Sequence, residues 1–231
     1  MDPDTIRHIA PLPFCPDAVI FDLDGLMLDS ERAAIQCYQE VSRQLATSIE
    51  PDFWLQIVGL GDVATRERLI TRLGVETAQQ LIEQTKDCSI KNIENGIPRR
   101  EGIIALLDFL MARNVPIAVA TSSRTPIAQR KLDSADLLWR FPIVCTASDV
   151  KETKPAPDIY RLAAQRLNVS APRCVVLEDS PTGVRAALAA EMTPIQVPDL
   201  IAPAPEVRAW GHRIVNSLAE AQRLLEAVFP T

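Results

Sequence analysis

Short, uninterrupted apolar runs recur along this 231-residue sequence and alternate with segments of helical periodicity. Continuous apolar runs of this length are typical of strands in parallel sheets that are covered on both faces. The runs lie at residues 18–21, 117–120, 143–145, 174–177, 195–197 and 213–215. Between them, apolar residues spaced three and four apart predict helices, for example over residues 103–111 and 159–167. The alternation predicts an α/β fold whose core is a parallel sheet sandwiched by helices.

The alternation stops between residues 29 and 98, where helical patterns replace strands. The expected helices cover residues 30–45, 53–58, 64–73 and 77–95, and Ser30 is expected to cap the first of them. We therefore predict a helical domain of residues 29–98. It is inserted directly after the first strand into an α/β core made of residues 1–28 and 99–231.

Composition excludes several classes of function. The 24 Lys+Arg against 30 Asp+Glu give a formal net charge of −6, and the basic residues form no block. Because affinity for nucleic acid comes mainly from neutralising phosphates, no nucleic-acid partner is expected. No apolar run approaches the roughly 18 residues of a membrane span. Prolines interrupt residues 1–16, which do not resemble a secretory signal. We expect a monomeric, cytoplasmic protein with no membrane partner.

The cysteines and histidines narrow the chemistry further. The five cysteines are scattered, odd in number and form no C-x-x-C, so we expect reduced thiols that serve mostly as small core residues. With only His8 and His212 available, catalytic triads built on histidine and zinc sites are not expected. The chemistry should rest on carboxylates, lysine and hydroxyls.

Two acidic pairs follow predicted strands. Asp22 and Asp24 are two residues apart, so both carboxylates can point to one side at the carboxyl end of the first strand. Glu178 and Asp179 follow another apolar run in the same way. Open α/β sheets bind ligands at this edge, and crowded carboxylates there can share a hard divalent cation such as Mg²⁺. The alternatives are a solvated turn for the first pair and helix capping by Asp179 or Ser180 for the second.

Two further segments supply hydroxyl and cationic groups. Thr121, Ser122 and Ser123 follow the run at 117–120, and Lys154 precedes a proline-rich turn. A hydroxyl with nearby backbone N–H groups, together with a lysine, can hold a phosphate. Each feature alone is common, as a helix start rich in Ser and Thr or as a solvated lysine. Together with the acidic pairs, they predict a site for a metal-bound phosphoryl group.

These four motifs, in this order, resemble those of the haloacid dehalogenase superfamily, in the branch of small-sugar phosphatases and β-phosphoglucomutase. The matching segments are residues 21–31, 121–123, 154–158 and 178–180, and the resemblance covers nearly the whole chain. It implies a Rossmann-like core and a helical cap domain that closes over it and contributes substrate selection. It also implies a Mg²⁺-dependent phosphatase that hydrolyses a small phosphorylated metabolite, with a sugar phosphate as the expected substrate, through an aspartyl-phosphate intermediate.

The resemblance implies a role for each motif residue. Asp22 would be the nucleophile, and Asp24 the general acid and base. The groups that would neutralise the phosphoryl oxygens are Thr121, the amide of Ser122 and Lys154. The groups that would hold Mg²⁺ are Asp22, Glu178, Asp179 and the backbone carbonyl of Asp24.

A phosphomutase is the nearest alternative. Mutase relatives carry a histidine ten residues after the second aspartate and an arginine three residues after a cap glycine. Here Ala34 occupies the first position, and Asp62, counted from Gly59, occupies the second. Because an acidic Asp62 would repel a second phosphate, hydrolysis is favoured. Arg66 or Arg68 could replace the missing arginine, so the mutase alternative stays open.

A dinucleotide-binding protein and a receiver domain are the alternatives from other functional classes. Gly59, Leu60 and Gly61 are predicted to form a cap loop that selects the substrate. Residues 59–64 also match the dinucleotide pattern G-x-G-x-x-[GA], but the preceding residues 53–58 make a poor strand. A receiver domain, a non-catalytic phosphate acceptor, also gathers acidic strand ends, a hydroxyl and a lysine. The long helical insertion and the second aspartate argue against a receiver.

Overall fold

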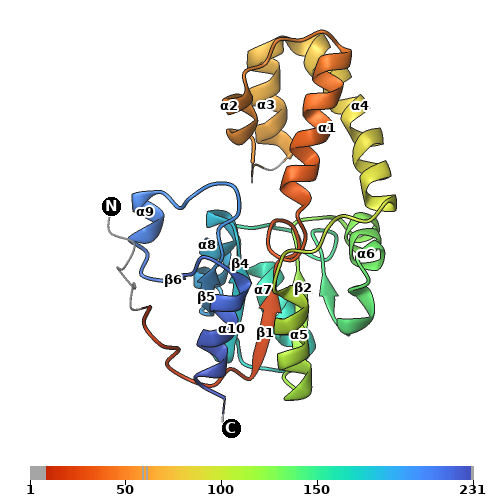
Figure 1. The fold of residues 1–231 in the computed structure, drawn as a ribbon. Helices are drawn as coiled ribbons and strands as arrows, with labels where there is room; N and C mark the ends of the chain where they lie inside the picture. Colours follow the sequence, from red (N-terminus) through yellow and green to blue (C-terminus); the bar gives the residue numbers. More distant parts are fainter. Residues whose placement is uncertain (1–8, 59, 61, 230–231) are drawn as a thin grey trace.

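A six-stranded parallel sheet forms the centre of the computed structural model, which describes residues 9–58, 60 and 62–229 and, for Asp62, the backbone alone (Figure 1). Its strands are β1 (Ala18–Phe21), β2 (Ile117–Ala120), β3 (Val144–Cys145), β4 (Cys174–Glu178), β5 (Thr193–Gln196) and β6 (Arg213–Ile214). Their order is β3-β2-β1-β4-β5-β6, and every neighbouring pair is parallel. The predicted α/β fold with a parallel sheet is confirmed.

Alternate residues of β1 face two different layers, which explains why the whole strand is apolar. Val19 and Phe21 belong to one hydrophobic core, while Ala18 and Ile20 belong to the other. The first core is closed by α5 (Ile103–Ala112), α6 (Thr125–Ser134) and α10 (Leu218–Glu226). The second is closed by α7 (Asp158–Leu167) and α8 (Pro181–Ala189). A short α9 (Pro205–Arg208) precedes β6.

Four helices fill the segment between β1 and α5, as the sequence predicts. They are α1 (Ser30–Gln44), α2 (Pro51–Leu55), α3 (Asp62–Leu73) and α4 (Val75–Glu94), and they stand above the carboxyl edge of the sheet in Figure 1. They pack around a separate apolar cluster that includes Trp54, Leu69 and Leu81. We call this helical region the cap. The prediction that Ser30 caps α1 is wrong, because Asp29 is the N-cap residue and Ser30 is the first residue of the helix.

The chain enters and leaves the cap through two adjacent passages. Leu28 pairs with Arg99 in an antiparallel bridge, the amide of Asp29 donates to the carbonyl of Pro98 over 2.8 Å, and the amide of Arg100 donates to Met27 over 2.8 Å. The two crossings are therefore hydrogen-bonded to each other.

A cluster of ion pairs lies beside these passages. Asp199, in the loop after β5, is 2% exposed and accepts from Arg32 of α1 over 2.7 Å and from Arg100. Arg32 also pairs with Asp29 over 2.8 Å. The second carboxylate oxygen of Asp199 is buried and has no hydrogen-bond partner among the described residues. Asp199 of the core thus pairs both with Arg32 in the cap and with Arg100, where the chain re-enters the core.

A disulfide connects the first and last helices of the cap. Cys37 of α1 and Cys88 of α4 are bonded, with their Cα atoms 5.6 Å apart. The expectation of reduced thiols throughout is therefore wrong for this pair. The spacing of the cysteines could not reveal it, because it depends on which faces of α1 and α4 meet after 51 residues of separation. Cys145 and Cys174 are free and buried, as expected for small core residues.

None of the described helices has both the length and the apolar character that crossing a membrane would require.

Candidate active site

The predicted acidic residues gather at the carboxyl edge of the two central strands. Asp22 directly follows β1, and Glu178 is the last residue of the neighbouring β4. One carboxylate oxygen from each of Asp22, Glu178 and Asp179 lies within 4.8 Å of the others. Because β1 and β4 are parallel, residues 156 positions apart reach the same place. The structure brings these three predicted ligands together.

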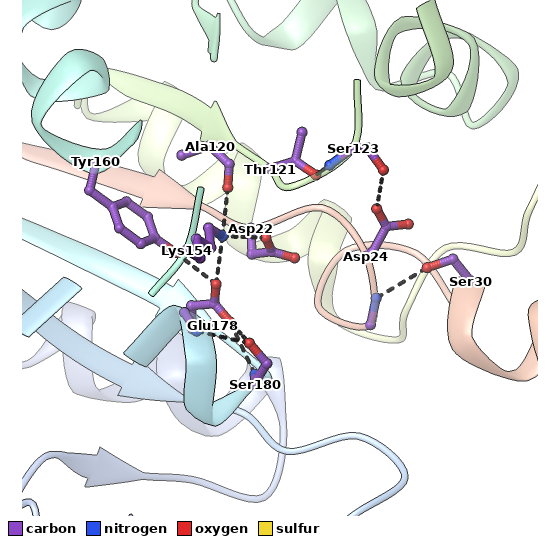
Figure 2. A network of polar contacts seen from close by, with 12 residues as sticks. Asp22, Asp24, Ser30, Ala120, Thr121, Ser123, Lys154, Tyr160, Glu178 and Ser180 are labelled. Atoms are coloured by element: carbon purple, nitrogen blue, oxygen red, sulfur yellow. Dashed lines mark hydrogen bonds and ion pairs between the residues drawn. The ribbon is translucent and has the colours of Figure 1, made fainter. Parts of the chain in front are cut away.

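Lys154 lies between two of these carboxylates. Its Nζ donates to Asp22 Oδ1 over 2.5 Å, to Glu178 Oε1 over 2.6 Å and to the carbonyl of Ala120 over 2.9 Å (Figure 2). The Lys154 side chain is 3% exposed. The ammonium also lies 4.7 Å from the centre of the Tyr160 ring. Such a buried lysine is an ionic partner of the strand ends and not a solvated surface group.

Glu178 is held from both sides. Tyr160 donates its hydroxyl to Oε1 over 2.7 Å, and the amide and hydroxyl of Ser180 each donate to Oε2 over 3.0 Å (Figure 2). Ser180 also caps α8, since its hydroxyl accepts from the amide of Gly183 over 3.0 Å. Ser180 therefore caps α8, as predicted, and also donates to one carboxylate of the acidic cluster.

The three clustered carboxyl groups have only Lys154 as a directly paired cation among the described residues, so negative charge is in excess. Burial raises the pKa of Asp22 to about 8, and Glu178 and Asp24 add to the rise while Lys154 opposes it. Burial, Glu178 and Asp22 hold the pKa of Asp179 well above its ordinary value. Burial is the largest single influence on Glu178 and would raise the pKa of its carboxyl, but Lys154, Ser180 and Tyr160 together lower that pKa. One ammonium thus neutralises part of a three-carboxylate cluster. An all-oxygen donor set with excess negative charge suits a hard divalent cation such as Mg²⁺.

Two glycines give the carboxylates room. A Cβ at Gly183 would lie 1.7 Å from Glu178 Oε1, and a Cβ at Gly25 would lie 2.2 Å from Asp179 Oδ2. Gly25 also has a φ of +78°, which favours glycine. These backbone positions are therefore part of the construction of the site.

Asp24 turns away from this cluster. Its Oδ2 accepts from the hydroxyl of Ser123 over 2.7 Å (Figure 2), and its Oδ1 accepts from Lys131 Nζ over 2.6 Å. Burial alone would raise the pKa of Asp24, but Lys131, with help from the hydroxyls of Ser123 and Ser30, lowers it. Ser30 also accepts from the amide of Gly25 over 3.3 Å, which ties the start of α1 to this loop.

The predicted hydroxyl-bearing residues, Thr121 to Ser123, directly follow β2, which lies next to β1. Thr121 is 1% exposed, its amide donates to Cys145 over 3.0 Å, and its Oγ1 accepts from the amide of Ser123 over 3.0 Å. Ser122 is exposed at the same edge. Thr121 and Ser122 are therefore at the carboxyl edge that carries the acidic residues.

The predicted cap loop is only partly described. Gly59 and Gly61 lie outside the described residues, and Leu60, between α2 and α3, is 37% exposed. The dinucleotide alternative lacks its structural context, because residues 53–55 lie in the helix α2 and not in a strand.

Sequence reasoning missed Lys131, Tyr160 and the contact of Ser123 with Asp24. Ser123 adjoins the predicted hydroxyls, so its position was a usable signal. Lys131 and Tyr160 come from α6 and α7, and no pattern in the sequence distinguishes them from other helical residues.

Comparison with known proteins adds independent information. Residues 19–197 match the family model described as haloacid dehalogenase-like hydrolase. The chain is 29% identical to a phosphorylated carbohydrates phosphatase of Thermotoga maritima over 215 residues, 91% of each chain. It is 35% identical to hexitol phosphatase A of Escherichia coli over 172 residues, 74% of this chain and 78% of that one. A solved structure from Thermotoga maritima, provisionally named as a β-phosphoglucomutase, superposes with a TM-score of 0.79 at 26% identity, covering 92% of this chain and 99% of the other.

Proposed function

This chain belongs to the haloacid dehalogenase-like hydrolases, and we propose that it is a Mg²⁺-dependent phosphatase that hydrolyses a small phosphorylated metabolite, such as a sugar phosphate, through an aspartyl-phosphate at Asp22. The observation that carries this proposal is the buried group of Asp22, Lys154 and Glu178 at the ends of the two central strands, with Asp24 two residues beyond. Both phosphatase relatives described above support the proposed class of reaction.

In the first step, a carboxylate oxygen of Asp22 attacks the phosphorus, and the ester bond between phosphorus and the leaving oxygen breaks. Asp24, which first takes up a proton because Lys131 favours its charged form in the resting protein, gives that proton to the leaving oxygen, so that an alcohol leaves. In the second step, a water molecule attacks the phosphorus and gives a proton to Asp24, and the bond between Asp22 and phosphorus breaks. Inorganic phosphate leaves, and both side chains return to their starting forms.

The surrounding residues bind and orient the phosphoryl group. Lys154, the hydroxyl of Thr121 and the amide of Ser122 are proposed to contact its oxygens, since all three lie at the carboxyl edge of β2, β1 and β4. Glu178, Asp179, Asp22 and the backbone carbonyl of Asp24 are proposed to hold Mg²⁺. When bound, Mg²⁺ supplies positive charge that neutralises the transferring group.

The cap is proposed to be a separate domain, residues 29–98, that closes over the site and selects the substrate through residues 59–61. Its separate apolar cluster supports this division, as does its place above the carboxyl edge of the sheet (Figure 1). A closed cap would exclude bulk water from the phosphorylated enzyme. We propose that the protein works as a monomer.

Phosphomutase activity is the second candidate, favoured by the structural similarity to the Thermotoga maritima protein. Ala34, on α1, has no imidazole with which to assist a second phosphate, which favours hydrolysis. A screen of phosphorylated metabolites that monitors both free phosphate and isomerised product separates the two reactions. Isomerisation without release of phosphate would favour the mutase.

The test of the proposed function uses p-nitrophenyl phosphate with Mg²⁺. We expect turnover that a chelator abolishes, that Asp22→Asn eliminates, and that Asp24→Asn slows by about 10²-fold through lost proton transfer. Asp108→Asn, which removes a 59% exposed carboxylate far along the chain from the site, is the matched control and should behave as the wild type. Activity that survives both Asp22→Asn and chelation would contradict the proposal.

A further inference from the structure

Both oxygens of the Asp24 carboxylate are engaged by side chains from outside its own loop. Lys131 Nζ, on α6, lies 2.6 Å from Oδ1, and Ser123 Oγ, in the loop between β2 and α6, lies 2.7 Å from Oδ2. Lys131 is also within 3.3 Å of Ser123 Oγ, so the three side chains form a closed triangle. Lys131 is 14% exposed and Asp24 is 24% exposed. The contact is an ion pair sheltered from most of the solvent.

The two lysines of the site divide its carboxylates between them. Lys154 is bonded to Asp22, Glu178 and the carbonyl of Ala120, which uses its three donors. Among the described residues, Lys131 is the one cation that forms an ion pair with Asp24. Asp24 therefore depends on Lys131 for its charge partner, while Asp22 and Glu178 depend on Lys154.

The pairing of Asp24 with Lys131 matters for the direction in which the Asp24 carboxylate points. This side chain rotates about only two torsions, and it lies two residues from Asp22, in the acidic cluster. Among the described residues, Lys131 is its one ion-pair partner, so without Lys131 no ion pair would fix the direction of the Asp24 carboxylate. The hydrogen bond from the Ser123 hydroxyl, in which only the acceptor is charged, is weaker than the contact with Lys131, in which both groups are charged.

We propose that Lys131 is a positioning residue, which holds the Asp24 carboxylate on the Ser123 side of the site, where it exchanges protons with the leaving group. This inference rests on the proposed function, because the proton exchange belongs to that reaction. In this proposal Lys131 acts through Asp24, since its side-chain contacts are with Asp24 and Ser123.

If Lys131 positions Asp24, its loss should lower kcat while leaving KM nearly unchanged. Lys131→Met is expected to lower kcat by about 10- to 100-fold, because small misplacements of a catalytic group are costly, while KM changes by less than about threefold. Lys131→Arg keeps the charge and is expected to restore kcat to within about threefold of the wild type. Arg130→Met removes one positive charge from an exposed neighbour on the same helix and is the matched control.

The leaving group gives a sharper readout. Phenyl phosphate releases a more basic oxygen than p-nitrophenyl phosphate and needs the proton of Asp24 more. Lys131→Met is therefore expected to lower kcat/KM for phenyl phosphate about tenfold more than for p-nitrophenyl phosphate. A general loosening of the fold would lower both values equally, and an equal loss overturns the inference.

The experiment separates failure of the inference from failure of the proposed function. Wild-type protein that hydrolyses neither ester would refute the proposed function. The inference is then decided by a crystal structure of Lys131→Met, in which the hydrogen bond between Asp24 and Ser123 should be lost. If that bond is retained, Lys131 does not position Asp24. Thermal unfolding checks that the variant is folded, and Lys131→Gln, which keeps a long polar side chain, replaces it if it is not.

Discussion

Asp22, Glu178 and Asp179 lie within one small volume at the end of the two central strands, and Lys154 pairs with the first two of them. The side-chain hydrogen bonds of Glu178 come from buried or half-buried partners, and the lack of a side chain at Gly183 leaves the space that its carboxylate occupies. The folded protein therefore fixes like charges at close range. Such an arrangement costs stability until a cation or a substrate binds.

We expect Asp179→Asn to stabilise the metal-free protein. The pKa of Asp179 is raised by burial, Glu178 and Asp22, so its charged form is disfavoured in the folded state. An acid whose pKa is higher in the folded state destabilises the fold as the pH rises above its unfolded value of about 3.9. The free energy of unfolding should therefore increase by about 1 kcal/mol at pH 8 in chelator, and by less at pH 5. Urea unfolding at both pH values measures this.

The same variant should lose the response to metal. Mg²⁺ is expected to raise the melting temperature of the wild type, because it binds only the folded state, and to leave Asp179→Asn nearly unchanged. Asp108→Asn serves again as the control, since that carboxylate is 59% exposed and its one ion-pair partner in the described part of the chain is Arg140. A variant that is less stable than the wild type at pH 8 would show that Asp179 carries no electrostatic strain.

The site residues at strand ends could be predicted, whereas those from helices could not. Asp22 and Glu178 follow apolar runs, and parallel strands must deliver their carboxyl ends to one edge. Lys131 follows Gln129 and Arg130 in a polar stretch of α6, where sequence gives no sign of which side chain turns inward. Its partnership with Asp24 depends on how α6 packs, which local patterns do not determine.

At the level of helices and loops, the ion pairs of Asp199 connect separate elements. They join the loop after β5 to α1 and to the segment that leaves the cap. Asp199 is 2% exposed, while Arg32 is 42% exposed and Arg100 is 20% exposed. A buried carboxylate bonded to two arginines contributes more than a surface pair, since water screens it less. This cluster therefore helps to fix where the cap stands on the core.

Asp199→Asn is expected to lower the free energy of unfolding by about 2 kcal/mol, because two charge-assisted hydrogen bonds become neutral while the shape of the side chain is kept. Asp108→Asn, which removes the charge of a 59% exposed carboxylate, should cost less than about 1 kcal/mol. Equal effects of the two substitutions on thermal or urea unfolding would show that the Asp199 cluster does not hold the two parts together.

The elements themselves could be predicted well, but their arrangement could not. Buried strands read as continuous apolar runs, and all six runs became strands. The order β3-β2-β1-β4-β5-β6 depends on crossovers that leave no local trace. The second cap helix begins at Pro51, two residues earlier than expected, because proline is well suited to the first turn of a helix.

At the scale of the whole molecule, the disulfide makes the cap a cross-linked unit. Cys37 and Cys88 join α1 to α4, and α3 also packs on α4. Cytosolic thiols are normally kept reduced, so the cytoplasmic location expected from the sequence and this bond favour opposite redox states. The stability of the cap should depend on the compartment in which the protein works.

Reduction is expected to destabilise the cap by about 4 kcal/mol, the chain-entropy value for a loop of this length. Thermal unfolding with and without dithiothreitol measures the change, and the double variant Cys37→Ser, Cys88→Ser should be insensitive to reductant. Thiol titration of the unfolded protein should give three free thiols before reduction and five after it. Five thiols without reductant would refute the cross-link.

The paired crossings between the cap and the core have a mechanical consequence. Leu28 bridges Arg99 on one side and Asp24 on the other, so the segment that leads into the cap is continuous with the loop that carries Asp24. Two connections that are hydrogen-bonded side by side allow the cap to bend relative to the core about one axis more easily than they allow it to twist. If the cap moves relative to the core about these two connections, we expect the Asp24 loop to move with it, so that the position of the Asp24 carboxylate changes as the cap opens.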